Sequence, residues 1–598
     1  MTARSLMLDL PFVPTPQRLL ATASGHESDA ACYHRNGDAW APTSWGDLAK
    51  NVNALARSLI AAGIKPQDRV AIFAYNRREW VMADLAIMMI GAVSVGIYFT
   101  AAPSEVEFIL QDSGSVILFV ENRAQLDKLS AILPTVPSLT RVVMIDGENL
   151  AATSWSNMLD QGRNLPDDER QSRLAAIMPD DLGTLIYTSG TTGQPKAVGL
   201  SHGALSQCLG VLQLMFHQTR ADRAISYLPL AHIAERMLSV HSFAAFGFSL
   251  YFAKSVQDLA AHLPQVRPTV FFGVPRVWEK MAGGLQQKLA QSSGLSGQIA
   301  AWAQQIGREW HRRDREALPR PLTLRIQYNL ANRLVYRKVK AALGFDGARM
   351  LISGAAPIAP ETLEFLTGLD MVVYELYGQS ETCGPTTSNL PGANRLGSVG
   401  RAIPGTEIKV GDDGEVLVRD GKLFTEYVGR PDATAETLIN GWLLSGDLGR
   451  IDQDGYLFIT GRKKDLIITA GGKNIAPSGI EAELETLPLV EHGIVVGDRR
   501  PFLVAVVTLS REALTHFATA HNLNPDDAAN NPLVRAEIQS GIDKINESQA
   551  RVAQIRRFAI LNQTFSVETG ELTPTLKLRR SVVADRCAAA IDQLYADR

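Results

Sequence analysis

The strongest chemical signal in the sequence is a short run of hydroxyl side chains and glycines that ends in a lysine. An expected strand over residues 185–187 leads into this run, which reads Thr188, Ser189, Gly190, Thr191, Thr192, Gly193, Gln194, Pro195 and Lys196. Glycines let backbone N–H groups approach an anion closely, and the hydroxyls and the ammonium add further donors. Ala197 follows the lysine where a Walker A loop would have Ser or Thr. The run therefore predicts a phosphate-binding loop of another class.

A second group of residues, between positions 352 and 384, could hold the base of a nucleotide and a metal ion. The small residues Gly354, Ala355 and Ala356 would let a flat ring lie against the backbone. Tyr377 offers an aromatic face for a purine, and Glu381 offers the oxygen ligand that Mg²⁺ prefers when it bridges phosphates. The alternative is a strand and turn with a surface glutamate. This alternative is weaker because the same chain contains a predicted phosphate-binding loop.

Two charged residues further along the chain could bind a ribose. Asp447 follows Ser and Gly in what reads as a tight turn, and an ionised carboxylate there could accept hydrogen bonds from two ribose hydroxyls. Arg462 ends an expected strand over residues 456–462 and could donate to the same ribose. Each residue alone is non-specific, but together and in this order they predict a ribose clamp.

In residue types and in order, these motifs resemble the AMP-forming, adenylate-forming enzymes, a family that includes acyl-CoA synthetases, luciferases and peptide-synthetase adenylation domains. The resemblance extends over about residues 40–580. Within the family, the chain is most similar to the long-chain fatty acyl-CoA synthetases. That closer match depends on SYLPLAHIAER (226–236), RPTVFFGVPRVWEKM (267–281) and the helical segment that follows.

The resemblance assigns expected roles to most of these residues. It implies that residues 354–356 and Tyr377 line the adenine site, that Gly378 belongs to the nucleotide-binding residues, that Thr382 contacts a phosphate, and that Glu381 holds Mg²⁺. It also implies that the catalytic lysine is Lys577, in a Pro-Thr-Leu-Lys sequence where many members have Pro-Ser-Gly-Lys. The alternative for Lys577 is a solvated basic tail.

His232 has two interpretations. A single histidine between Ala231 and Ile233 is commonly a hydrogen-bonded core residue. In the family that the chain resembles, a histidine or aromatic residue at this position lies beside the acyl carboxylate and moves between the two half-reactions. We expect the second role.

The activity implied by the resemblance is a two-step ligation that uses ATP, Mg²⁺ and coenzyme A. A medium- to long-chain fatty acid first forms acyl-AMP with release of pyrophosphate, and the CoA thiol then displaces AMP. Lys577 would act in the first step only. A rotation about Lys464 would then bring Gly471 and Gly472 to the active site, where glycines would leave room for the pantetheine arm. No residue is assigned as the base for the thiol.

Two rival functions remain as alternatives to acyl-CoA synthesis. A fatty acyl-AMP ligase would pass it to a carrier protein, but such relatives carry an insertion after the hinge, and residues 463–480 contain none. A non-catalytic nucleotide- or lipid-binding relative would have lost some of the motif side chains. The sequence leaves acyl chain length and oligomeric state open.

Composition limits the setting of this chemistry. The chain has 598 residues, of which 46% are hydrophobic and 20% charged, and its net charge of −3 gives no sign of nucleic-acid binding. Its four cysteines lie far apart without metal-ligand spacing, which favours reduced thiols in the cytoplasm. Asp9 and Pro11 interrupt the apolar N-terminus, so it makes a poor signal peptide.

The elements that must position these residues indicate an α/β fold. Expected strands over residues 69–75, 115–121 and 141–146 alternate with amphipathic helices such as residues 45–63, which is typical of layered, largely parallel sheets. A β-rich segment over residues 385–461 follows. We expect a large N-terminal AMP-binding domain (1–462) with this β-rich subdomain, and a small mobile C-terminal α/β domain (463–598).

Residues 285–342 differ from the rest of the large domain. They have few strand signals and carry eleven Lys and Arg against three acidic residues, a net +8 on a chain that is otherwise −11. We expect a basic helical insertion with three open interpretations: a solvated surface, a docking site for anionic lipid with Trp302 and Trp310 at the interface, or a site for the CoA phosphates. The lipid interpretation would make a cytoplasmic protein peripherally membrane-associated.

Overall fold

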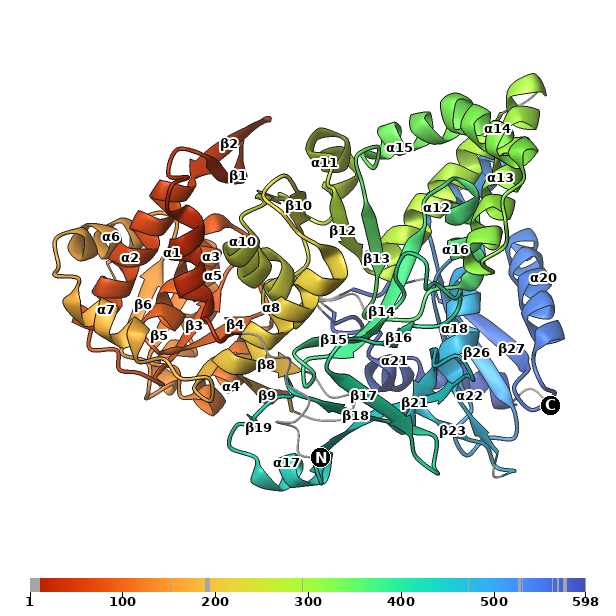
Figure 1. Cartoon of the computed structure of the whole chain (residues 1–598). Helices are drawn as coiled ribbons and strands as arrows, with labels where there is room; N and C mark the ends of the chain where they lie inside the picture. The colour runs from red at the N-terminus through yellow and green to blue at the C-terminus, as the bar shows by residue number, and fades with distance from the viewer. Residues whose placement is uncertain are drawn as a thin grey trace.

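The computed structural model describes residues 11–150, 152–188, 194–292, 294–471, 473–524, 529, 531–561, 563–566, 569–573 and 578–596. It is a layered α/β protein in which a large N-terminal part leads into a smaller C-terminal part (Figure 1). The predicted fold class is confirmed. The mobility of the C-terminal part stays a prediction.

The central layer of the N-terminal part is an eight-stranded sheet. Its strand order is β19 (Glu426–Tyr427), β9 (Lys196–Ser201), β8 (Leu182–Thr188), β4 (Val93–Ile97), β3 (Arg69–Phe73), β5 (Ile117–Val120), β6 (Arg141–Met144) and β7 (Thr153–Ser154). Strands β8, β4, β3, β5, β6 and β7 pair in parallel, and β8–β9–β19 are antiparallel.

Alternation along β3 shows why this sheet needs helices on both faces. Val70 and Ile72 point into one apolar cluster, whereas Ala71 and Phe73 point into another. The first cluster includes α2 (Trp45–Ala61) and α3 (Arg78–Met89), and the second includes α4 (Pro103–Ser113) and α5 (Arg123–Leu129). The Ser44 side chain accepts a hydrogen bond from the Asp47 backbone and starts α2 where the sequence predicted it.

Three further sheets complete the N-terminal part. One contains β12 (Val270–Gly273), β13 (Met350–Ser353), β14 (Val373–Gln379), β15 (Gly384–Ser388) and β16 (Arg401–Ala402). A second contains β17 (Thr406–Val410), β18 (Glu415–Asp420), β21 (Trp442–Ile451) and β20 (Leu438–Ile439), with β22 (Leu457–Arg462) paired to β21. The third contains β10 (Arg223–Ser226), β11 (Ser249–Phe252), β1 (Ala30–Asn36) and β2 (Ala39–Ser44).

Other helices pack around these sheets. They are α1 (Thr15–Ala23), α6 (Trp155–Arg163), α7 (Asp168–Ala175), α8 (His202–Phe216), α9 (Ile233–Arg236), α10 (Phe243–Phe246), α11 (Leu259–Val266), α16 (Pro360–Gly368) and α17 (Pro431–Thr437).

The C-terminal part has its own core. Its sheet orders β25 (Val490–Val496), β26 (Leu503–Leu509) and β27 (Ile555–Leu561), beside a two-stranded ribbon of β23 (Ile467–Ile468) and β24 (Asn474–Ile475). Its helices are α18 (Pro477–Glu485), α19 (Arg511–Ala520), α20 (Pro532–Ser548), α21 (Arg580–Arg586) and α22 (Ala588–Ala596). Its two apolar clusters run from Ile467 to Ile591 and share no residue with those before it.

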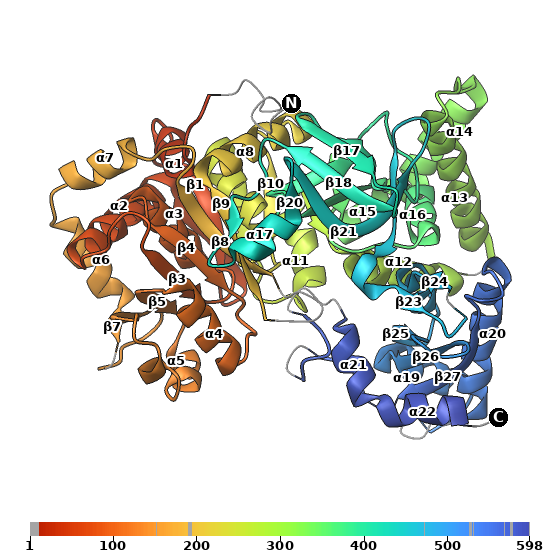
Figure 2. The same cartoon turned by 90° about the horizontal axis from the view of Figure 1, so that it is seen from below.

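The basic segment is helical, as the sequence predicted. It comprises the end of α12 (Pro275–Ala290), then α13 (Gly294–Arg315), α14 (Leu322–Ala331), the π-helical turn η4 (Asn332–Tyr336) and α15 (Arg337–Leu343). Of these helices, α13 and α14 lie at one outer edge of the molecule (Figure 1 and Figure 2). No helix within the described ranges is both long and apolar enough to cross a membrane.

Candidate active site

A β-hairpin carries both ends of the predicted phosphate-binding loop. Thr188 ends β8, Lys196 begins β9, and the two residues face each other in the antiparallel register. The sheet therefore fixes both ends of the loop side by side. The residues predicted to form the middle of the loop lie outside the described residues, and they are Ser189, Gly190, Thr191, Thr192 and Gly193.

The ammonium of Lys196 is linked to Glu381 through a tyrosine that the sequence analysis missed. Lys196 Nζ lies 4.6 Å from the centre of the Tyr427 ring, and the Tyr427 hydroxyl donates to Glu381 Oε1 at 2.7 Å. Tyr427 belongs to β19, which pairs with β9 next to the lysine. Burial and the neighbouring Glu381 raise the pKa of Tyr427, so it stays a donor. We call this the lysine cluster: Lys196, Glu381 and Tyr427.

The turn between β14 and β15 holds Glu381 in place. The Thr382 hydroxyl accepts from the Gln379 backbone at 2.9 Å and donates to the Gly384 carbonyl at 2.7 Å. A side chain on Gly378 would place its Cβ 2.0 Å from that same carbonyl, so only glycine fits. The Thr382 hydroxyl thus already ties its own turn together, and its contact with a phosphate stays a prediction.

The predicted ribose residues come together around one buried carboxylate. Asp447 Oδ2 accepts from the Tyr377 hydroxyl at 2.7 Å and from Gln379 Nε2 at 2.6 Å, and Arg462 Nε lies 3.1 Å from Oδ1. Burial, with Asp447 beside it, raises the pKa of Tyr377 well above its ordinary value. Gln379 was missed because a glutamine two residues past a predicted site residue carries no signal of its own. We call this the aspartate cluster: Tyr377, Gln379, Asp447 and Arg462.

The tight turn predicted at Asp447 is wrong. Residues 445–447 lie inside strand β21, and Asp447 pairs directly with Arg462 across β21 and β22. Gly446 has a φ of 71°, and the register of β21 against β18 shifts at this point. The Ser-Gly-Asp sequence is therefore an irregularity in a strand rather than a chain reversal, because glycine can take a positive φ without leaving the sheet.

The small residues predicted to face adenine follow the carboxyl end of β13. Ser353 ends this strand, which runs parallel to β14 with Ser353 opposite Glu375. Gly354 is buried, and Ala355 has a left-handed backbone with φ of 76°. A positive φ is strained for alanine and is found at sites that hold a backbone in one shape. Gly354, Ala355 and Ala356 thus lie one strand away from Tyr377, and their contact with a base stays a prediction.

His232 lies at the beginning of α9. Its Nδ1 accepts a hydrogen bond from the Ala234 backbone at 3.3 Å, which caps the helix, and its side chain is half-buried. The geometry is compatible with either predicted role.

The predicted hinge follows the aspartate cluster directly. Arg462 ends β22, and Lys463–Asp465 forms a short 3₁₀ turn in which Lys464 is exposed. Lys463 forms ion pairs with Asp413 at 2.7 Å and Glu415 at 2.9 Å, so the residue before Lys464 is anchored to the N-terminal part. Gly471 is exposed between β23 and β24.

Two predicted residues of the C-terminal part, Gly472 and Lys577, lie outside the described residues. Described neighbours join the two parts at other points. Arg579 Nη2 lies 3.9 Å from Glu105 Oε1 on α4, and Arg276 Nη2 lies 3.8 Å from Glu491 Oε1 on β25.

No set of three His, Cys, Asp or Glu side chains gathers as a metal site among the described residues. Mg²⁺ usually takes only one or two protein carboxylates and otherwise uses phosphates and water. Glu381 is the carboxylate in the lysine cluster. The four cysteines, Cys32, Cys208, Cys383 and Cys587, are free and buried.

Sequence comparison decides the family. The sequence model of the AMP-binding enzyme family matches residues 20–428. The sequence model of the AMP-binding enzyme C-terminal domain matches residues 464–598. The chain belongs to the AMP-binding enzyme family. The two clusters lie mainly on the first match, with Asp447 and Arg462 between the two matches.

Relatives in this family match the chain over nearly its whole length. The long-chain-fatty-acid–CoA ligase FadD15 of Mycobacterium bovis is 36% identical over 607 residues, which cover 99% of this chain and 99% of that protein. The long-chain-fatty-acid–CoA ligase ACSBG2 of Xenopus laevis is 35% identical, covering 98% of this chain and 84% of that protein.

Solved structures share the fold of this AMP-binding enzyme. The anthranilate CoA ligase AuaEII in complex with anthranoyl-AMP has a TM-score of 0.75 at 19% identity and covers 99% of this chain and 100% of its own. The adenylation domain of a carboxylate reductase from Mycobacterium chelonae has a TM-score of 0.77 at 21% identity, covering 100% of this chain and 93% of its own.

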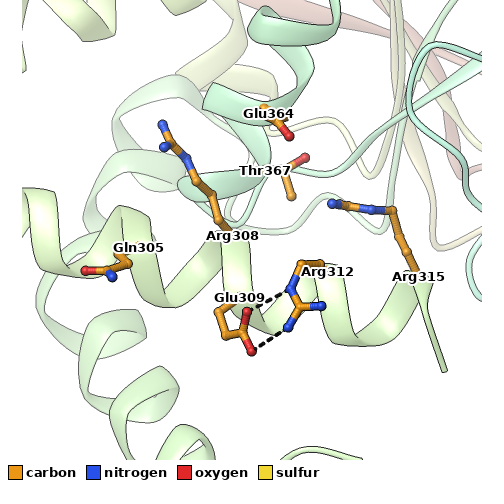
Figure 3. A pocket seen from close by; sticks show the side chains of 7 residues that line it. All are labelled: Gln305, Arg308, Glu309, Arg312, Arg315, Glu364 and Thr367. Atoms are coloured by element: carbon orange, nitrogen blue, oxygen red, sulfur yellow. Dashed lines mark hydrogen bonds and ion pairs between the residues drawn. The ribbon is translucent and has the colours of Figure 1, made fainter. Parts of the chain in front are cut away.

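A separate pocket lies on the helical insertion, away from both clusters. Figure 3 shows Arg308, Arg312 and Arg315 of α13 around it, facing Glu364 and Thr367 of α16. Arg312 forms a fork with Glu309 rather than pointing a free charge into the pocket.

Proposed function

We propose that this protein activates a medium- to long-chain fatty acid with ATP and Mg²⁺ and transfers the acyl group to coenzyme A, releasing AMP and pyrophosphate. The family membership supports adenylate chemistry. The names of the relatives that match almost end to end support a long-chain fatty acid and CoA as the other substrates.

One observation carries the proposal: residues 377–381 connect both clusters. Tyr377 and Gln379 bind Asp447, and Glu381 binds Tyr427 beside Lys196. A nucleotide whose ribose contacts Asp447 would therefore find its phosphates directed toward Glu381 and Lys196. This arrangement suits attack on the α-phosphate.

In the first step the fatty carboxylate attacks the α-phosphorus of ATP and pyrophosphate leaves. Negative charge on the phosphoryl oxygens would be met by Lys196, by Lys577 and by the hydroxyls and backbone of the loop, so positioning and charge neutralisation account for most of the rate. Glu381 would hold Mg²⁺, which supplies charge neutralisation at the phosphates. His232 would lie beside the carboxylate.

In the second step the CoA thiol attacks the acyl-adenylate carbonyl and AMP leaves. We place the domain boundary between Arg462 and Lys463, because the apolar clusters on either side share no residue. Anchoring of Lys463 by two carboxylates favours Lys464 as the point of rotation. Rotation would withdraw Lys577 and bring Gly471 and Gly472 to the site.

We place the protein in the cytoplasm with peripheral contact to membranes. Four free, buried cysteines suit a reducing compartment. A substrate with a long alkyl chain partitions into bilayers, so a docked enzyme would meet it at higher concentration.

Release of AMP that depends on both CoA and a fatty acid, followed across fatty acids of increasing length, tests this function. We expect turnover that rises into the medium- to long-chain range. Pyrophosphate release without any use of CoA would indicate a fatty acyl-AMP ligase instead. The absence of ATP-dependent turnover with every fatty acid would indicate a non-catalytic relative.

Lys464→Pro tests the rotation separately. Proline fixes φ and restricts the preceding residue, so acyl-AMP should still form while transfer to CoA fails. Normal transfer to CoA in this variant would show that Lys464 is not the hinge.

A further inference from the structure

The helical insertion carries a dense group of exposed apolar side chains. Five of the thirteen large apolar residues that are exposed on the described chain fall within residues 318–334. Four of them are spaced by four along α14 and η4, with exposed fractions of 73% for Leu322, 60% for Ile326, 48% for Leu330 and 38% for Leu334. Residues four apart share one face of a helix, so these side chains form one stripe. We call it the α14 stripe.

The opposite face of the same helix is already packed. Leu324, Ala331 and Tyr336 are buried in the core of the insertion, and Tyr328 stacks on Trp310 with ring centroids 4.0 Å apart. The α14 stripe therefore faces away from α13. In Figure 1 and Figure 2, α14 lies at the outer edge of the molecule.

Two arginines of α13, and Arg320 beyond it, form ion pairs within the insertion. Arg312 pairs with Glu309 at 2.9 Å, Arg313 pairs with Glu309 at 2.6 Å, and Arg320 pairs with Asp314. Figure 3 shows the fork between Arg312 and Glu309. Trp310, stacked between Tyr328 and Arg320, belongs to the core of the insertion. A docking role for Trp310 or for these arginines, which the sequence left open, is not supported.

Further positive charge lies around the α14 stripe. Arg325, Arg333, Arg337 and Lys338 are exposed, and none of the ion pairs between described residues uses them. The sequence has no Asp or Glu over residues 317–345. On a helical projection, Arg333 and Arg337 fall on the face of the stripe itself.

We propose that α14 and η4 form a docking surface for an anionic lipid bilayer. The α14 stripe enters the headgroup boundary, and the surrounding Arg and Lys side chains bind lipid phosphates. A helix with an apolar face and basic flanks lies in the plane of such an interface. The proposal rests on the proposed function, because the fatty acid substrate is what makes contact with a bilayer useful.

Two other occupants fit this surface less well. A second copy of the chain would bring the same basic residues face to face in a symmetric contact, which like charges oppose. The CoA phosphates would explain the positive charge but not four exposed apolar side chains in a row. Anionic lipid matches both the charge and the apolar face.

Flotation of the full-length protein with vesicles of phosphatidylcholine and phosphatidylglycerol tests the surface. Pure phosphatidylcholine vesicles serve as the neutral comparison, and binding is measured at low and moderate salt. We expect Arg325→Gln with Arg333→Gln and Arg337→Gln to lower partitioning about 100-fold and to remove its salt dependence. Ile326→Gln with Leu330→Gln should lower it at least about tenfold at either salt concentration.

Matched substitutions elsewhere provide the controls. Leu533 on α20 is 49% exposed, almost the same as Leu330, so Leu533→Gln controls for the loss of an exposed leucine. Arg312→Gln removes an arginine that is already paired. Both controls should bind vesicles like the wild type. Equal binding by the α14 variants and the wild type, or equal losses in the controls, would overturn the proposal.

Two further readouts separate the alternatives. If sedimentation velocity without lipid shows a dimer that the stripe variants convert to a monomer, while vesicle binding is unchanged, the surface is a self-association site and the proposal fails. Turnover of a short, water-soluble fatty acid should be the same in the α14 variants and the wild type. No turnover by the wild type would contradict the proposed function. The vesicle assay would still test the docking surface, because it does not depend on turnover.

Discussion

The aspartate cluster and the lysine cluster balance their charges in opposite ways. Asp447 is 5% exposed and receives three donors from the protein, which hold the carboxylate in position before any ligand arrives. Lys196 lies over the face of an aromatic ring, and no ion pair between described residues uses its ammonium. The aspartate cluster is therefore preorganised, and the charges of Asp447 and Arg462 offset each other. In the lysine cluster, the ammonium of Lys196 remains able to bind an anionic ligand.

This difference assigns binding to one cluster and rate to the other. A group that is already held in position binds substrate and transition state about equally, so its loss appears mainly in KM. A cation without an anionic partner can respond to charge that develops during the reaction, and its loss appears in kcat. Substitutions in the two clusters should therefore have different kinetic signatures.

The largest effect is expected from the lysine that the C-terminal part would add. Lys577→Ala should lower formation of acyl-AMP about 100- to 1,000-fold, because Lys577 would meet charge that develops only in the first transition state. Formation of acyl-CoA from supplied acyl-AMP should be spared. Equal losses in the two half-reactions would contradict the assignment.

Lys196→Met should lower kcat for acyl-AMP formation about 100-fold with little change in KM for ATP, because methionine keeps the length of the side chain but removes its charge. Single-turnover kinetics measures the step directly. A rise in KM with normal kcat would place Lys196 in the same class as Asp447 and remove the contrast between the clusters.

Asp447→Asn should act mainly on binding. A hydrogen bond to a charged group contributes about 1.5–3 kcal/mol, which corresponds to a rise of about 10- to 100-fold in KM for ATP. At saturating ATP, kcat should recover most of its value. A variant that stays slow at saturating ATP would show that the aspartate takes part in the chemical step.

The smallest effect is expected for Tyr427→Phe, which keeps the ring beside Lys196 and removes only the hydroxyl that binds Glu381. We expect a fall in kcat of less than about tenfold and a higher Mg²⁺ requirement, because Glu381 loses one donor. Tyr427→Leu removes the ring as well and serves as the comparison. If both variants need no more Mg²⁺ than the wild type, Tyr427 does not position Glu381.

The sequence predicted which residues form the site better than it predicted the local backbone conformation around them. The sequence analysis found Thr188, Lys196, Tyr377 and Asp447. A run of hydrogen-bond donors, an aromatic side chain or a charged residue carries chemical information when it occurs in a known order. Tyr427 could not be found, because its role depends on β19 pairing with β9 more than 200 residues earlier in the chain. The turn at Asp447 was mistaken because a Ser-Gly-Asp sequence is equally suited to a turn and to an irregular strand.

Surface properties were the least predictable. The net charge of residues 285–342 can be counted in the sequence. Which arginines form ion pairs depends on contacts in the fold, such as that of Arg312 with Glu309. Likewise, tryptophan is the residue type expected at a membrane interface, yet Trp310 packs on Tyr328. The exposed apolar side chains are instead leucines and an isoleucine of α14 and η4.

Fatty-acid-dependent exchange of labelled pyrophosphate into ATP, measured without CoA, tests the central account most directly. The wild type should catalyse exchange, Asp447→Asn should recover exchange when ATP is raised, and Lys196→Met should stay slow at any ATP concentration. No exchange by the wild type, or recovery of Lys196→Met at high ATP, would contradict adenylation by these two clusters.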